Sequence, residues 1–205
     1  MNYSIQRVCV AVVCSLSVSA VFAQSDSPDL FIKQLTEETV QQLKSDKNLS
    51  TGDSSQVVAW AEKNVLNNFD FQRMTALAVG KDWRSASVEQ KQKLSNEFKT
   101  LLVRTYANAL SSYKNQTVEY KPYKEDDSAN EAVIKTMIVQ PGKKPVDVNY
   151  SVEKIDGRWK IYDINVAGVS LVTNYRDAFG VEIRNNGIDG LIAMLQTKNA
   201  GKAKT

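Results

Sequence analysis

The spacing of apolar positions changes once along the chain, near residue 116. Before this point, apolar residues recur every three or four positions, which is typical of amphipathic helices. After it, the period becomes two, as in half-buried strands, until two further helical stretches close the chain. We therefore expect helices at 27–47, 53–69, 87–113, 169–183 and 188–198, a short apolar piece at 71–80, and strands at roughly 117–124, 131–140, 145–154 and 158–166. Helices, an antiparallel meander and more helices indicate an α+β domain.

Capping residues mark several helix starts. Ser27 precedes Pro28, a favoured first helical residue, and Ser87 with Gln90 has the spacing of a capping box, as do Asp53 and Gln56. The stripe in the long helix consists of Leu94, Phe98, Leu101, Leu102, Tyr106, Ala109, Leu110 and Tyr113. We expect this stripe to cover the apolar face of the sheet.

The alternation in the strands predicts one dry and one wet sheet face. In the third strand one side carries Val146, Val148, Tyr150 and Val152, and the other carries Asp147, Asn149, Ser151 and Glu153. In the fourth strand, Lys160, Tyr162, Ile164 and Val166 are predicted to share a face opposite Trp159 and Ile161. Gly168 would then permit a sharp turn, with Ser170 as the cap of the next helix.

The first residues have the features of a secretory signal. A short segment with one basic residue, Arg7, precedes an apolar run that ends in small residues before Gln24. We expect a signal peptide at 1–23, a single domain at 24–198 and a flexible tail at 199–205. Both cysteines, Cys9 and Cys14, lie in the signal, so the mature chain must depend on its core, and a bacterial periplasm is the expected location.

Charge and composition exclude several classes of function. Without Arg7 the net charge falls from +3 to +2, which gives no argument for nucleic-acid binding. The chain contains no histidine, so histidine-activated nucleophiles and histidine-ligated metals are impossible. Acids, lysines and tyrosines remain as possible acid–base groups, but no tight carboxylate pair or nucleotide-binding loop is present. We expect no catalysis, no metal and no cofactor.

The apolar faces allow two interpretations, a filled core or a ligand cavity, because one periodicity produces both. The dry surfaces are rich in tyrosines, namely Tyr106, Tyr113, Tyr150, Tyr162 and Tyr175. Their hydroxyl groups either reach water at the rim of a cavity or lie at the edge of an ordinary core. The pattern does not decide between these.

Two segments carry a resemblance to a known family. "FDFQRMTALAVGKDWRSASVEQKQKLSNEFKTLLVRTYANALSSY" and "GRWKIYDINVAGVSLVTNYRDAF", followed by "GIDGLIAML", resemble the MlaC family of periplasmic phospholipid-binding (toluene tolerance) proteins. The resemblance covers essentially the whole mature chain. It implies a twisted four-stranded sheet, similar to cystatin and nuclear-transport-factor-like folds, that encloses an apolar cavity with the helices. It also implies a monomeric carrier that moves phospholipid between an outer-membrane lipoprotein complex and an inner-membrane ABC transporter with an MCE-domain protein, and so maintains outer-membrane asymmetry.

With this resemblance, the dry sheet face and the corner after the fourth strand become the expected cavity wall. The candidate lipid-binding residues are Phe71, Met74, Leu77, Val79, Phe98, Leu102, Tyr106, Met137, Val148, Tyr150, Val152, Tyr162, Ile164, Val166, Val169, Val172 and Tyr175. Asp163, Asn174 and Arg176 are expected to form structural hydrogen bonds, and Trp83 to anchor the turn before the long helix. Two alternatives remain: an enzyme that uses Asp163 with Tyr162, and an interaction module with a solid core.

Overall fold

The structure is a computed structural model that describes residues 27–46, 49, 54–111, 115–124 and 129–201. The predicted signal peptide and the capping residue Asp53 lie outside these ranges. Among the described residues, no helix is both long enough and apolar enough to cross a membrane.

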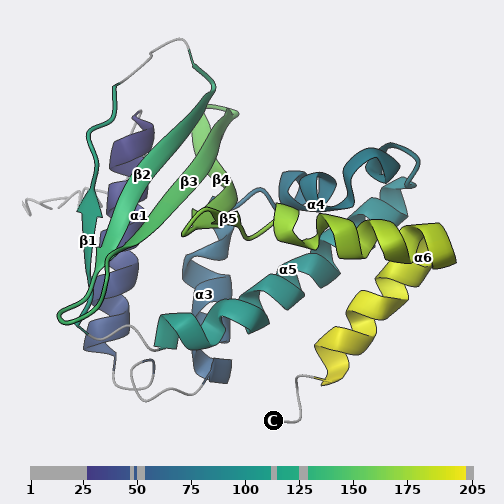
Figure 1. The fold of residues 1–205 in the computed structure, drawn as a ribbon, viewed down its shortest axis with the longest axis horizontal. Coiled ribbons are helices and arrows are strands. Elements are labelled where there is room, and N and C mark those ends of the chain that lie inside the picture. The colour runs from purple at the N-terminus through teal and green to yellow at the C-terminus, as the bar shows by residue number, and fades with distance from the viewer. Residues whose placement is uncertain (1–26, 47–48, 50–53, 112–114, 125–128, 202–205) are drawn as a thin grey trace, which may run out of the picture.

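An antiparallel sheet lies at one end of the molecule with a helix packed against it, and the other helices pack against one another at the other end (Figure 1). The helices are α1 (Pro28–Ser45), α3 (Ser54–Asn64), α4 (Phe71–Val79), α5 (Val88–Ser111) and α6 (Arg176–Gly201), with 3-10 turns at Leu66–Asn68, Gly80–Arg84 and Thr173–Tyr175. The strands, in their spatial order, are β1 (Thr117–Tyr120), β2 (Glu131–Val139), β3 (Val146–Ile155), β4 (Arg158–Val166) and β5 (Val169–Ser170). The predicted α+β class is confirmed.

The sheet has five strands rather than the predicted four, because the chain reverses directly after β4. Ala167 and Gly168 both have positive φ, 51° and 88°, which suits a two-residue hairpin turn. Val169 and Ser170 then pair with Val166 and Asn165 as a fifth strand. The helix predicted from residue 169 consequently begins only at Arg176.

The dry face of the sheet is covered by α1, not by the long helix. Phe31 and Ile32 of α1 pack with strand residues to form the sheet core, whose buried members are Phe31, Ile32, Ala132, Ile134, Val152, Trp159 and Ile161. The long helix α5 instead packs against α3, α4 and α6. The prediction for the stripe of α5 was wrong because α1 presents its own apolar face to the sheet.

The helices build a second core, here called the helical core. Its buried members are Met74, Ala78, Val79, Leu94, Phe98, Leu101, Leu102, Val172, Phe179, Leu191, Ile192 and Leu195. Phe98 is fully buried and meets Tyr175 and Phe179 edge-to-face, with ring centroids 5.2 Å away in each case. Phe69 packs against both the helical core and the sheet core. These two cores therefore meet near Phe69, and a third, smaller cluster consists of Leu43, Leu49 and Val57 with Trp60 beside it.

A β-bulge places Tyr162 on the wet face, contrary to the predicted alternation. Ser151 pairs with Asp163 while Val152 pairs with Ile161, so Tyr162 is the extra residue in β4. Its hydroxyl group donates to Glu131 Oε2 at 3.1 Å. Because the bulge shifts the phase, Ile161 and Ile164 both pack in the sheet core. The predicted alternation holds in the middle of β3, where Val148 and Val152 are buried and Asp147 is exposed, but Val146 is exposed and Glu153 is half-buried.

Some helix ends follow the predicted signals, although Ser27 precedes α1 without a side-chain capping bond. Gln90 N–H donates to Ser87 Oγ at 3.1 Å, and Ser87 N–H donates to Gln90 Oε1 at 3.0 Å, so the capping box is confirmed. The predicted break near residue 187 is also present, since Gly187 has φ 72° and interrupts α6. The helix then continues through residues 199–201, which were predicted as tail. Asn199 is buried there, and its amide donates to Glu97 Oε2 at 2.7 Å.

Candidate functional site

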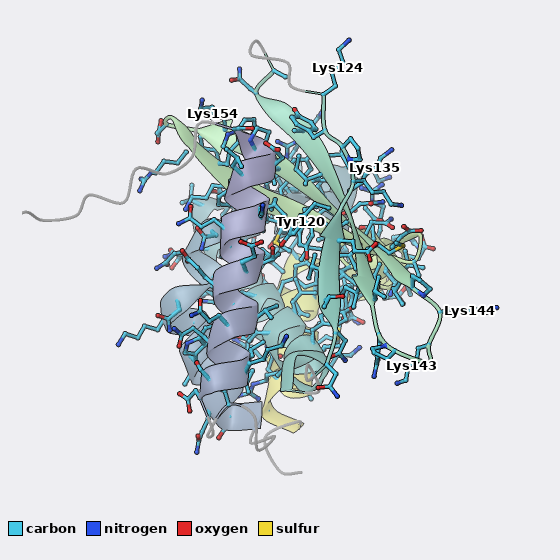
Figure 2. All side chains as sticks on the ribbon, turned by 90° about the vertical axis from the view of Figure 1, so that its left-hand side faces the viewer. Tyr120, Lys124, Lys135, Lys143, Lys144 and Lys154 are labelled. Carbon is cyan, nitrogen blue, oxygen red and sulfur yellow. The ribbon has the colours of Figure 1, made fainter. Side chains whose placement is uncertain are left out.

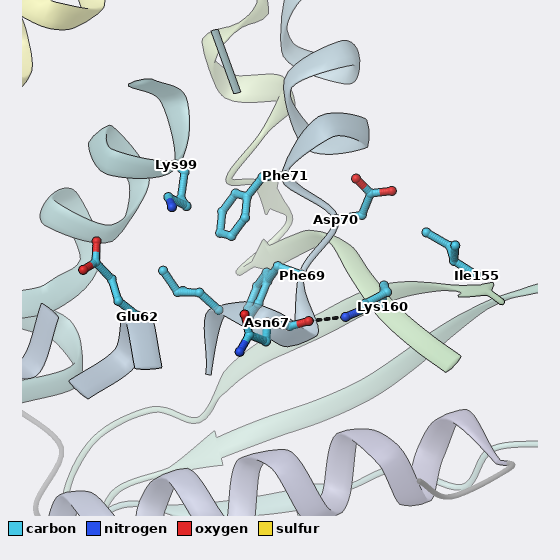
Figure 3. A pocket seen from close by; sticks show the side chains of 9 residues that line it. Glu62, Asn67, Phe69, Asp70, Phe71, Lys99, Ile155 and Lys160 are labelled. Carbon is cyan, nitrogen blue, oxygen red and sulfur yellow. Dashed lines mark hydrogen bonds between the residues drawn. The ribbon is translucent and has the colours of Figure 1, made fainter. Parts of the chain in front are cut away.

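A cavity of about 480 Å³ lies between the two cores (Figure 3). It is bounded by α3, the start of α4, α5 and the ends of β3 and β4. Its lining residues are Glu62, Leu66, Asn67, Phe69, Asp70, Phe71, Lys99, Ile155 and Lys160. A volume of this size is in the range of small-ligand pockets, about 300–1,000 Å³.

The segment from Leu66 to Phe71 forms one wall of this cavity because it is attached to the edge of β4. Phe69 forms a parallel bridge with Ile161, and the Asp70 N–H donates to the Ile161 carbonyl at 2.8 Å. The Asp70 carboxylate accepts from the Arg73 N–H at 2.9 Å and so caps α4. Lys160 donates to the Asn67 carbonyl oxygen.

The cavity combines an apolar centre with charged groups at both sides. Phe69 and Phe71 stack with centroids 5.7 Å apart, and Figure 3 shows them between Glu62 and Lys99 on one side and Asp70 and Lys160 on the other. Burial lowers the pKa of Lys160, as does Arg158, while Asp70 opposes that shift. Such a site can hold an amphiphile, with its apolar part on the rings and its charged part near the lysines.

Most predicted wall residues lie in packed cores rather than in this cavity. Phe71 is the predicted residue that lines it. The helical core and its border contain Phe71, Met74, Leu77, Val79, Phe98, Leu102, Tyr106, Val172 and Tyr175. The sheet core and its border contain Tyr150, Val152 and Ile164. These side chains thus fall into two groups rather than one wall.

The remaining predicted residues are scattered over the sheet. Val148 is buried, and Met137 and Val166 are half-buried. Val169 is 53% exposed, and Tyr162 lies on the wet face. A lipid contact by any of the predicted wall residues remains a prediction. The sequence analysis did not identify Leu66, Phe69 and Ile155 as cavity residues. The segment "FDF" at 69–71 could have indicated two aromatic rings on either side of a capping residue, Asp70.

Two tyrosine hydroxyl groups at apolar borders find partners within the protein, and the predicted Tyr113 lies outside the described residues. Tyr106 bonds to Tyr175, and burial together with this neighbour raises the pKa of Tyr106. Tyr120 lies 2.6 Å from the Thr36 hydroxyl, and burial is the main cause of its raised pKa. The contact between Tyr106 and Tyr175 supports the interpretation of these two tyrosines as the border of an ordinary core.

Tyr120 also lines a second cavity, of about 580 Å³, between α1 and β1. Figure 2 shows the Tyr120 side chain beside α1. Val40 and Val118 contribute apolar surface, and Lys44 donates to the Gln116 carbonyl at 3.5 Å. None of the predicted wall residues lines this second cavity.

The corner after β4 is held by polar bonds, as predicted for Asp163 and Arg176. Ser170 Oγ accepts from the Val172 N–H at 3.2 Å and the Thr173 N–H at 2.9 Å, at the start of the 3-10 turn before α6. Asp163 hydrogen-bonds Ser170, yet burial raises the pKa of Asp163 overall. Arg176 donates through two nitrogens to the Leu77 carbonyl, at 3.0 and 2.8 Å. Asp163 and Tyr162, the pair required by the enzyme alternative, thus bond to different partners.

Metal chemistry gains no support from the described residues, which hold no cluster of acidic ligands that could bind an ion. Both cavities have charged borders that a ligand could contact.

Comparison with known proteins gives a consistent result. A model of the MlaC protein family matches residues 33–197. The toluene tolerance protein ttg2D of Pseudomonas putida is 34% identical over 106 residues, which are 52% of this chain and 49% of that protein. The intermembrane phospholipid transport system binding protein MlaC of Haemophilus influenzae is 25% identical over 173 residues, 83% of this chain and 81% of that protein.

A solved structure is similar in both sequence and fold. It is the phospholipid-binding protein from Ralstonia solanacearum in complex with a phospholipid. The TM-score is 0.80 at 34% identity, and the match covers 86% of this chain and 98% of that chain.

Proposed function

We propose, from the premise that the chain belongs to the MlaC family, that it is a phospholipid carrier. The observation that carries the proposal is the close similarity to a protein whose structure contains a bound phospholipid. The cavity between the two cores supports it, because an apolar centre with flanking charges suits a molecule that has acyl chains and a charged head group.

The energetics of an acyl chain explain why a carrier of this kind needs no catalytic group. Each methylene exposed to water costs about 0.8 kcal/mol, so a free diacyl lipid is nearly insoluble. A protein that buries many methylenes against apolar side chains offsets this cost without directional bonds. Phe69 and Phe71 offer such a surface, and Lys99 or Lys160 can face a phosphate.

The proposed setting is the periplasm, where the protein would act as a monomer. There it would take phospholipid from one membrane complex and deliver it to another, and thereby maintain the asymmetry of the outer membrane. The expected partners are an outer-membrane lipoprotein complex and an inner-membrane ABC transporter with an MCE-domain protein. The predicted secretory signal at residues 1–23 supports this location.

Native mass spectrometry of the mature protein, purified from cells without detergent, tests the proposal. We expect an added mass equal to that of a diacyl phospholipid, which organic extraction of the same sample should recover. Protein that is free of lipid both in the spectrum and in the extract would contradict the proposal.

A pair of variants then tests the cavity. Phe71→Glu places a charge among the lining residues, whereas Val133→Glu places the same charge on a side chain that is already 49% exposed. We expect Phe71→Glu to lose most of the bound lipid and Val133→Glu to retain it, with unchanged circular dichroism in both. Equal lipid content in both folded variants would refute the cavity assignment.

A further inference from the structure

Arg73, in the first turn of α4, contacts three strands of the sheet. Its Nη2 lies 2.8 Å from Glu131 Oε1 on β2, and its Nη1 binds Glu153 Oε2 on β3. Its guanidinium carbon lies 3.6 Å from the ring centroid of Tyr162 on β4. Tyr162 in turn donates to the second oxygen of Glu131 at 3.1 Å. One side chain therefore connects a helix to β2, β3 and β4.

This contact joins the two halves of the molecule beside the cavity. Met74, the next residue after Arg73, is buried in the helical core, whereas Glu153 and Tyr162 belong to the sheet. Phe69 and Phe71, which line the cavity, precede Arg73 by four and two residues. Any movement of Arg73 away from the strands would move the start of α4 and, with it, this wall of the cavity.

The cluster places two carboxylates around one guanidinium. Glu153 is only 16% exposed, and its Oε1 has no hydrogen-bond partner among the described residues. Burial raises the pKa of Glu153 although Arg73 opposes the shift, and Asp70 and Glu131 add to it. Partly buried ion pairs of this kind often add little to stability, but removal of one partner is costly. The carboxylates thus depend on Arg73 to remain close together.

We propose that Arg73 is a positioning residue that clamps α4 to the sheet and sets the rate at which bound phospholipid leaves the cavity. This inference rests on the proposed function. When the guanidinium releases Glu131 and Glu153, α4 turns away from β2 and β3 about the bond between Asp70 and Ile161, and the cavity widens at Phe71. The clamp uses a side chain, so it can open without loss of the backbone bond between Asp70 and Ile161.

The chemistry of the clamp requires arginine. A planar guanidinium can bind two carboxylates through separate nitrogens and stack on an aromatic ring at once. A lysine ammonium is a point charge and cannot reproduce this arrangement. Arg73→Lys should therefore keep the net charge of the cluster but lose much of its geometry.

The test measures transfer of a fluorescent phosphatidylethanolamine from the loaded mature protein to acceptor vesicles that contain a quencher. The variants are Arg73→Met, Arg73→Lys and Glu131→Gln. The matched control is Lys121→Met, which removes the ion pair between Lys121 and Asp147, 2.6 Å apart on the same sheet. We expect Arg73→Met to release lipid about tenfold faster, equivalent to about 1.4 kcal/mol, Arg73→Lys and Glu131→Gln to be intermediate, and the control to match the wild type.

The outcomes separate this inference from the proposed function. A wild-type protein that takes up no lipid would refute the carrier proposal itself. A wild type that carries lipid, with folded Arg73→Met that releases it at the same rate, would overturn the clamp alone. If Arg73→Met fails to fold, Arg73→Lys and Glu131→Gln decide the question, and wild-type rates in both would overturn it.

Discussion

Substitution of Phe98 by alanine tests whether this residue belongs to a filled core or to the wall of a lipid cavity. Phe98 has no exposed surface and packs edge-to-face against Tyr175 and Phe179. If the structure is right, the substitution leaves a hole that its neighbours cannot fill. If Phe98 instead borders a hollow, its removal only enlarges a space that is already empty.

The expected loss of stability is large because the substitution removes the buried apolar ring and also leaves a cavity, and the two costs add. Phe-to-Ala changes in packed cores cost about 3–5 kcal/mol, and each aromatic edge contact accounts for about 0.5–1.5 kcal/mol beyond area burial. Domains of this kind have total stabilities of about 5–15 kcal/mol. We therefore expect Phe98→Ala to lower the free energy of unfolding by about 4 kcal/mol.

Urea titration of delipidated protein, followed by tryptophan fluorescence, measures this loss. With a slope of about 2 kcal/mol per molar urea, the midpoint should fall by about 2 M. Delipidation is necessary because bound ligand stabilises the native state. Phe71→Ala is the matched control. Its ring is half-buried and lines the cavity, so about 1–2 kcal/mol is expected. Equal, small losses in both variants would refute the assignment of Phe98 to a filled core.

Three further predictions follow from the corner and the last helix. Arg176→Met removes two bonds to the Leu77 carbonyl at the end of α4 and should cost about 1–2 kcal/mol in urea titrations, whereas no loss would contradict a structural role. Burial raises the pKa of Asp163 above its ordinary value of 3.8, so its buried charge should lower stability as the pH rises through that raised pKa. Asp163→Asn should therefore gain stability relative to the wild type as the pH rises through that raised pKa, and a difference that does not change with pH would refute the argument. Gly187→Ala meets no neighbour within 4 Å but must adopt φ 72° and ψ −175°, so a loss of about 1–3 kcal/mol in thermal or urea unfolding is expected, and an unchanged midpoint would contradict the strain.

Local signals predicted local structure well. The Ser87–Gln90 box, the three long strands β2 to β4 and the break near Gly187 all depend on residues close in sequence, and the structure places them as expected, whereas β1 ends at Tyr120 instead of residue 124. Which helix covers the dry face of the sheet depends on tertiary contacts, because α1 and α5 have similar apolar stripes. The sequence pattern offered no means to choose between them.

The position of the cavity was harder to predict for a related reason. The bulge at Tyr162 changes the phase of β4, and period-two counting cannot detect one extra residue. The wall formed by Phe69 and Phe71 depends on the bridge to Ile161, which is a contact between distant parts of the chain. The sequence pattern predicts which apolar side chains are buried, but it does not show where a cavity remains between two cores.

The two apolar centres that share Phe69 have a consequence for cooperativity. A chain with one continuous core opens as a unit, whereas centres joined through few side chains form separate cooperative units. Native-state hydrogen exchange should therefore yield two groups of slowly exchanging amides, one in β2–β4 with α1 and one in α4–α6, with different opening free energies. Removal of the ring in Phe69→Ala should widen the gap between the two groups, since each unit could then open with less effect on the other.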